Sequence, residues 1–166
     1  MKNEDQLSEK ELTTALRRRA MDYLARREHS RYELQCKLRE KFDVPSDAMI
    51  ASVLDRLEAD NLLSNARFAE SYVRARVGRG YGPLYIRHQL RQRQVDSVLI
   101  DQVLNFDEQD WMNVLADALA KKLTDVPERG SRQWLKLQRF SQSRGFSPAH
   151  FHGALQDKLP SLLRFR

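Results

Sequence analysis

The stretch IASVL at residues 50–54 decides the fold, because it returns as IDQVL at residues 100–104 and as FHGAL at residues 151–155. In each copy the apolar side chains stand at positions i, i+3 and i+4, which places them on one face of an α-helix. The copies follow one another at intervals of about fifty residues. A repeat of this length predicts tandem units, each too small to bury its apolar face well alone.

Two further apolar patterns repeat in step with the first, which gives three helices per unit. Ala20, Tyr23 and Leu24 return as Ala69, Tyr72 and Val73 and, more weakly, as Ala116, Leu119 and Ala120; Leu34 and Leu38 return as Ile86 and Leu90, whereas the third copy keeps only Phe140, with Lys136 at the other place. The sequence therefore predicts an all-α fold of three tandem three-helix repeats in an elongated, curved array. The predicted parts are a flexible acidic leader (1–11) and repeats at 12–63, 64–107 and 108–166.

Helix starts are predicted from side chains that can accept hydrogen bonds from the first backbone N–H groups of a helix. The candidate caps are Thr13 or Thr14, Ser30, Ser46, Ser64 or Asn65, Ser131 and Ser147. Pro83, after three closely spaced glycines, suits the first position of a helix.

The composition limits the environment of the protein. No apolar stretch approaches the ~20 residues that a membrane span needs, and residues 1–11 are polar and acidic, unlike a signal peptide. Cys36 is the only cysteine, which excludes an internal disulfide and fits a reducing cytosol. We therefore expect a cytoplasmic protein that does not associate with a membrane. We also expect it to be a monomer.

Charge alternates along the chain in phase with the repeat. Residues 16–41, 64–94 and 129–166 have net charges of +5, +6 and +7, whereas residues 42–63 and 95–128 have net charges of −4 and −6. The middle helix of each unit is thus basic, and the third helix is acidic in the first two units. This segregation indicates a basic surface for an anionic partner. Pairing of basic and acidic helices between neighbouring units is the alternative, and both can hold together.

The sharpest local motif is GRGYGP at residues 78–83. A phosphate-binding glycine loop would follow a strand, and a P-loop would continue with Lys-Ser or Lys-Thr, but neither feature is present. The motif therefore predicts that one helix stops and another begins. Arg79 and Tyr81 on this turn, beside Arg74, Arg76 and Arg87, could contact phosphate and stack on a base or a partner side chain.

No set of residues in the sequence points to catalysis or metal binding. His150 and His152 diverge by about 200° around a helix and have no third ligand nearby in sequence. No carboxylate pair reads as a general acid and base, and no nucleophile has a companion base. We expect a protein that is not an enzyme and needs no cofactor or metal.

Together, several of these stretches resemble the RecX family, bacterial regulators of the RecA recombinase. The likeness rests on Arg67-Phe68-Ala69-Glu70, Arg74 and Arg76, then Gly80-Tyr81-Gly82-Pro83 with Ile86 and Leu90, on Arg27, Ser30, Glu33, Leu34, Lys37 and Leu38, and on Arg144-Gly145-Phe146. It spans residues 15 to 163, approximately. Asn65 stands where the family usually has Asp, and Gln94 stands where a Gly is usual.

The resemblance implies a small protein of three three-helix repeats that docks along the groove of the RecA–DNA filament. Such proteins suppress the ATPase, strand-exchange and co-protease activities of RecA. The family's contact residues do not transfer by motif, so charge and spacing alone select the candidates. The expected contacts with the filament and with single- and double-stranded DNA are Arg31, Lys37, Arg39, Lys41, Arg74, Arg76, Arg79, Tyr81, Arg87, Arg91 and Arg93.

Two other functions fit parts of the sequence. A general DNA-binding protein of helix-turn-helix-like units would place a second or third helix in a major groove, but acidic third helices oppose this. A protein-interaction scaffold without nucleic-acid contact would leave the basic residues as a solvated face.

Overall fold

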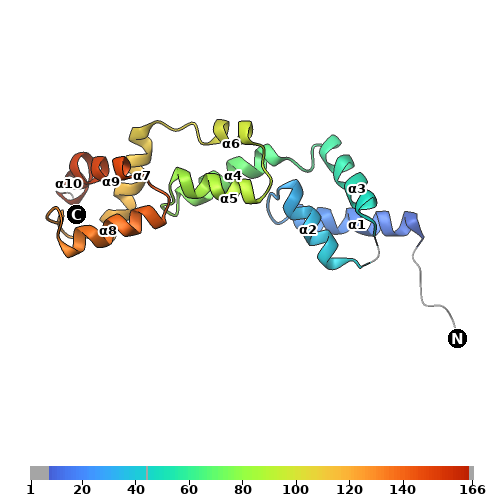
Figure 1. The fold of residues 1–166 in the computed structure, drawn as a ribbon. Coiled ribbons are helices and arrows are strands. Elements are labelled where there is room, and N and C mark those ends of the chain that lie inside the picture. Colours follow the sequence, from blue (N-terminus) through green and yellow to red (C-terminus); the bar gives the residue numbers. More distant parts are fainter. Residues whose placement is uncertain (1–7, 44, 165–166) are drawn as a thin grey trace. The chain divides into compact units, whose positions relative to one another are not determined.

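The computed structural model describes residues 8–43 and 45–164, and all regular structure within these ranges is helical (Figure 1). The helices are α1 (Glu9–Leu24), α2 (Arg31–Lys41), α3 (Asp47–Ala59), α4 (Asn65–Val77), α5 (Pro83–Gln92), α6 (Ser97–Val103), α7 (Glu108–Ala120), α8 (Arg132–Ser143), α9 (Pro148–Gly153), the π-helical turn η1 (Ala154–Lys158) and α10 (Leu159–Arg164). The all-α prediction is confirmed. Residues 1–7 of the predicted leader lie outside the described residues.

The packing divides the described chain into two compact units. The first contains the described residues up to Ala69 together with Arg93–Val95, and the second contains Glu70–Gln92 and the described residues from Asp96 onward. In the first unit α1, α2 and α3 all contact one another. Their core is apolar and includes Leu16, Ala20, Leu34, Leu38, Ile50, Leu54 and Leu57, each fully buried.

The second unit is built around the later repeats. Here α5 packs on α6, α7 packs on α9, η1 and α10, and α8 packs on α9. Ile86, Leu90, Ile100, Leu115 and Phe151 are among its most buried side chains. The sequence triplets are therefore core residues: all nine positions are buried except Val103, which is half-buried.

Most predicted helix starts are confirmed by hydrogen bonds. The hydroxyl groups of Ser30, Ser46, Ser64, Ser131 and Ser147 each accept from the backbone N–H three residues later. Pro83 begins α5 as predicted. These caps use only local sequence, which explains why the sequence predicts them well.

The predicted start of α1 at Thr13 or Thr14 is wrong. The helix begins at Glu9, because Ser8 and Glu11 form a capping box in which each side chain bonds the other's backbone N–H. Thr13 and Thr14 lie inside the helix, where their hydroxyls donate to the carbonyls of Glu9 and Lys10. Part of the predicted leader, residues 9–11, is therefore helical.

The second helix of the third repeat departs from the repeat pattern. In α8 the buried positions are Leu137 and Ser141, whereas Lys136 is exposed and Phe140 is half-buried. The Ser141 hydroxyl donates to the Leu137 carbonyl at 2.9 Å, which lets a polar residue occupy a buried position. The inward face of α8 is thus displaced by one residue from the repeat pattern.

Candidate functional site

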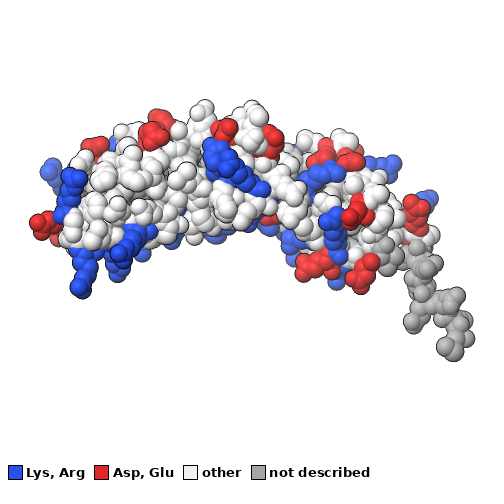
Figure 2. Space-filling view, viewed as in Figure 1, with Lys and Arg blue, Asp and Glu red and all other residues white. Residues whose placement is uncertain are grey.

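The two arginines of α2 are paired with carboxylates of the same unit. Arg31 is bound by Asp55 at 2.7 Å and also pairs with Glu58, both on α3. Burial disfavours the charged form of Arg31, but these two carboxylates outweigh it and raise its pKa. Arg39 pairs with Asp47 at 2.8 Å. The interleaving of acidic and basic side chains over the first unit is visible in Figure 2.

The two lysines predicted as contacts on α2 differ in their surroundings. The Lys37 ammonium lies over the Tyr23 ring, 5.0 Å from its centroid, and forms a cation–π contact with it. Lys41 is exposed at the last residue of α2. Of the α2 cations predicted as contacts, Lys41 is therefore the most accessible to an anionic partner.

The same pairing recurs between α5 and α6. Arg87 forms an ion pair with Asp101, and its side chain is only 31 % exposed. Arg91, one turn further along α5, is exposed and pairs with no carboxylate of the described chain. The second and third helices of a group thus attract each other, in α2–α3 and in α5–α6 alike. Ion pairs between neighbouring repeats, which the alternative interpretation of the charge pattern expected, join Arg67 to Glu28 and Arg93 to Glu33.

The GRGYGP turn gathers a cluster of aromatic and cationic side chains in the second unit. Tyr81 stacks on Tyr85 with ring centroids 4.3 Å apart, and the Arg144 guanidinium lies 4.3 Å from the Tyr81 centroid. Arg76 lies 4.8 Å from the Tyr72 centroid and 5.7 Å from that of Tyr81. Tyr81 is therefore engaged by its own neighbours, which weakens the idea that it stacks on a base.

Arg74 and Arg79 are the accessible charges of this region. Both are exposed, and neither pairs with a carboxylate of the described residues. The Arg79 carbonyl accepts a hydrogen bond from Arg144 Nη1 at 2.9 Å, so the turn that carries Arg79 is held in place. Together with Arg91, these two arginines form what we call the free arginine set.

Backbone hydrogen bonds join the GRGYGP turn and the start of α5 to the residues that follow α8. Gly82 N–H donates to the Arg144 carbonyl at 2.7 Å, and Leu84 N–H donates to the Gly145 carbonyl at 3.1 Å. Gly145 has a φ of +85°, a conformation that suits glycine. The GYGP and RGF motifs, distant in sequence, thus meet as two sides of one contact.

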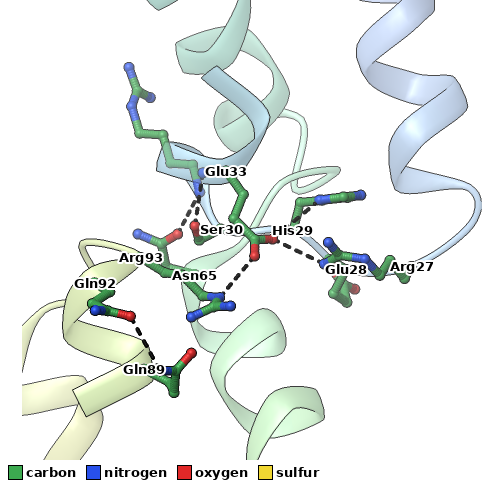
Figure 3. A network of polar contacts seen from close by, with 10 residues as sticks. Arg27, Glu28, His29, Ser30, Glu33, Asn65, Gln89, Gln92 and Arg93 are labelled. Atoms are coloured by element: carbon green, nitrogen blue, oxygen red, sulfur yellow. Dashed lines mark hydrogen bonds and ion pairs between the residues drawn. The ribbon is translucent and has the colours of Figure 1, made fainter. Parts of the chain in front are cut away.

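A polar network in the first unit surrounds Glu33 of α2 (Figure 3). Its carboxylate accepts from Arg27 Nη1 and from Arg93 Nε, each at 3.0 Å, and lies 3.3 Å from His29 Nδ1. Arg93, predicted as a filament contact, is therefore bound within the protein. The sequence indicated Glu33 only as one of the residues that resemble the RecX family.

Beside this network, α4 is joined to the loop before α2. The Arg31 backbone N–H donates to Asn65 Oδ1 at 2.8 Å, and Arg67 Nε donates to Glu28 at 2.8 Å. Asn65 was a predicted cap for α4, but the cap is Ser64, and the Asn65 amide serves α2 instead. These contacts join residues more than thirty positions apart, which no local pattern indicates.

Glu33→Gln is expected to destabilise the protein at neutral pH by about 1–2 kcal/mol. Burial raises the pKa of Glu33, but the contacts with His29, Arg27 and Arg93 outweigh it and lower the pKa to about 2, from an ordinary 4.5. A lowered pKa stabilises the folded state above pH 4.5, and this contribution disappears as the pH falls from 4.5 towards 2.

Thermal unfolding followed by circular dichroism at pH 7, 5 and 3 measures this effect. The difference between the natural protein and the Glu33→Gln variant should shrink as the pH falls. Glu40→Gln, an exposed position on the same helix, is the matched control and should change little. A constant difference at all three pH values would show that Glu33 is not stabilised as a carboxylate.

The described residues define an all-helical repeat protein whose accessible arginines suit an anionic partner. Within them, no group of three or more His, Cys, Asp or Glu side chains could hold a metal ion, and no helix is long and apolar enough to cross a bilayer. The His150 side chain accepts from the Ser147 backbone N–H in the capping box of α9, and its Nε2 lies 2.7 Å from Glu108.

Comparisons with known proteins identify the family. A family model described as RecX, first three-helix domain, matches residues 17–57, and one described as RecX, second three-helix domain, matches residues 64–104. The chain is 44 % identical to a regulatory protein RecX of Pseudomonas putida over 132 residues, covering 80 % of this chain and 83 % of that one. The RecX of Pseudomonas entomophila is 45 % identical over 133 residues, covering 80 % and 84 %.

Solved structures agree with these sequence matches. A crystal structure of a regulatory protein RecX superposes with a TM-score of 0.72 and 26 % identity, covering 93 % of this chain and 74 % of the other. RecX from Lactobacillus salivarius gives a TM-score of 0.73 at 23 % identity, covering 90 % and 97 %, and supports the fold alone. The chain belongs to the RecX family of regulatory proteins.

Proposed function

We propose that this protein regulates the RecA recombinase by binding the RecA–DNA filament and lowering its ATPase, strand-exchange and co-protease activities. The observation that carries the proposal is the 44 % identity, over 80 % of the chain, to proteins named regulatory protein RecX. The site of action is the cytoplasm, where RecA works, and the protein acts as a monomer without a cofactor.

The mechanism needs binding energy and no chemical step. A ligand that binds one state of an assembly and not another stabilises the state that it binds. The gain in free energy grows with the logarithm of the ratio of ligand concentration to Kd. The free arginine set supplies exposed charge for phosphates or acidic protein surfaces, because Arg74, Arg79 and Arg91 are not neutralised by the described carboxylates. Arg31, Arg39 and Arg87 already have carboxylate partners and contribute less.

Titrating the protein into RecA that is hydrolysing ATP on single-stranded DNA tests the proposal. We expect hydrolysis to fall as the protein is added. Inhibition well below one copy per RecA protomer would indicate capping of filament ends, whereas inhibition only near saturation would indicate binding along the groove. No inhibition at any ratio, with both proteins folded and RecA active, would contradict the proposal.

A general DNA-binding protein that acts without RecA is the second candidate, favoured by the same exposed arginines. Sequence-specific binding to duplex DNA in the absence of RecA would support it. The acidic residues Asp55, Glu58 and Asp101 on α3 and α6 oppose it, because a third helix in a major groove would bring these exposed carboxylates towards phosphates.

A further inference from the structure

The second unit contains a basic recess whose lining includes Arg79 and Arg144 of the cluster described above. It has a volume of about 470 Å³ and lies among the end of α4, the GRGYGP turn, α7 and α8. Its lining contains four cationic side chains and a single carboxylate, Asp117. The cations are Arg79 from the turn, Lys121 and Lys122 after α7, and Arg144 after α8.

The recess also has an aliphatic part to its lining. Val77, Val114 and Ala118 line it together with Gly80. A methyl group on Gly80 would lie 2.8 Å from the Ala118 Cβ, and Gly80 has a φ of +74°, so glycine allows the turn to approach α7. Half-buried aliphatic side chains beside the exposed cations Arg79, Lys121 and Lys122 suit a ligand that is both apolar and acidic.

The aromatic side chains at the recess are already engaged by cations. Lys122 Nζ lies 5.0 Å from the Phe140 centroid, and the Arg144 guanidinium lies 5.1 Å from it. Arg144 also covers the Tyr81 ring, which stacks on Tyr85. A single-stranded nucleic acid is typically held by bases stacked on free aromatic faces, and the recess offers none at these two rings.

We propose that this recess binds an acidic segment of a protein partner, with one apolar side chain against Val114 and Ala118 and flanking carboxylates against Arg79, Lys121 and Lys122. Its volume lies within the roughly 300–1,000 Å³ of typical ligand pockets, which is enough for a side chain and its neighbours. The inference rests on the proposed function, because it takes a protein of the filament, and not its DNA, as the occupant.

Site-specific photocrosslinking tests which polymer enters the recess. A benzophenone amino acid replaces Asp117, an exposed lining residue, in the full-length protein, which is irradiated with RecA filaments on poly(dT). We expect a crosslink to a RecA peptide rich in Asp and Glu. A crosslink to the DNA, or none while the filament is still bound, would overturn the recess inference and leave the proposed function standing. Failure of the unaltered protein to bind filaments would overturn the proposed function and this inference with it.

A pair of charge-neutralised variants provides an independent measure. Lys121→Gln with Lys122→Gln should weaken filament binding about 10-fold, whereas Arg132→Gln with Arg139→Gln, exposed on α8 and outside the recess lining, should weaken it less than about 3-fold. Lys121→Gln alone, which disturbs no aromatic contact, should show part of the loss with unchanged helicity. Equal losses from the two double variants would overturn the inference.

Discussion

Gly145→Ala is expected to lower the free energy of unfolding by about 3 kcal/mol or more, because two costs fall on one added methyl group. Gly145 has a φ of +85°, where an L-residue is strained. The methyl group would also meet the backbone nitrogen of Tyr85 and lie 2.5 Å from its Cβ. Neither atom is the end of a flexible side chain, so the clasp between α8 and α5 would have to open.

Two other glycines separate the conformational cost from the crowding cost. Gly130 has a φ of +80° with nothing within 4 Å of an added methyl, so Gly130→Ala should cost only about 1 kcal/mol. Gly82 lacks a positive φ, but its methyl would lie 2.5 Å from the Gly145 carbonyl oxygen. Gly82→Ala should therefore fall between the other two variants.

Thermal unfolding of the three variants by circular dichroism measures the series. At about 2–4 °C per kcal/mol for a chain of this size, Gly145→Ala should lower the Tm by about 10 °C. A Tm for Gly145→Ala no lower than that for Gly130→Ala would show that the contact between the GYGP and RGF motifs is not formed in solution.

The elements were predictable because their signals are local. A serine before each of five helices and the i, i+3, i+4 triplets depend on neighbours within one or two turns, and the caps and buried faces follow them. The register of α8 was not predictable from the repeat, since Ser141 is buried by virtue of its hydrogen bond to a carbonyl of the same helix. Hydropathy alone assigns such a serine to the surface.

The candidate site was less predictable, because charge pairing depends on residues that are distant in sequence. Arg31 meets Asp55 across 24 positions and Arg93 meets Glu33 across 60. Composition shows that these segments are basic, but it does not show which cations have partners. The usual glycine at position 94, by contrast, has a structural reason: Gln94 has a φ of 54°, in the left-handed region.

Neutralising the free arginine set should cost far more binding than neutralising the paired arginines. Arg74→Gln, Arg79→Gln and Arg91→Gln together remove three exposed charges that no described carboxylate neutralises. If each contacts a phosphate of single-stranded DNA, affinity should fall on the order of 100-fold at moderate salt, and the slope of log affinity against log salt should become shallower by about 2. The natural protein must show a steep salt slope for this to be seen.

The matched control is the triple variant Arg31→Gln, Arg39→Gln and Arg87→Gln. It removes the same charge, but from side chains already bound by Asp55, Asp47 and Asp101. We expect the affinity for DNA to fall less than about 3-fold, because these arginines contact carboxylates of the protein and not phosphates of the DNA. The slope of log affinity against log salt should stay almost the same.

Fluorescence anisotropy with labelled oligo(dT) and with RecA filaments, over a range of salt, compares the two triple variants. A larger loss for the Arg31, Arg39 and Arg87 variant would mean that the partner displaces the α3 and α6 carboxylates and that α2 and α5 form the binding surface. A flat salt dependence for the natural protein on DNA would exclude phosphate contacts. If the protein still bound RecA filaments in that case, its exposed arginines would have to contact acidic surfaces of RecA, because phosphates would already be excluded.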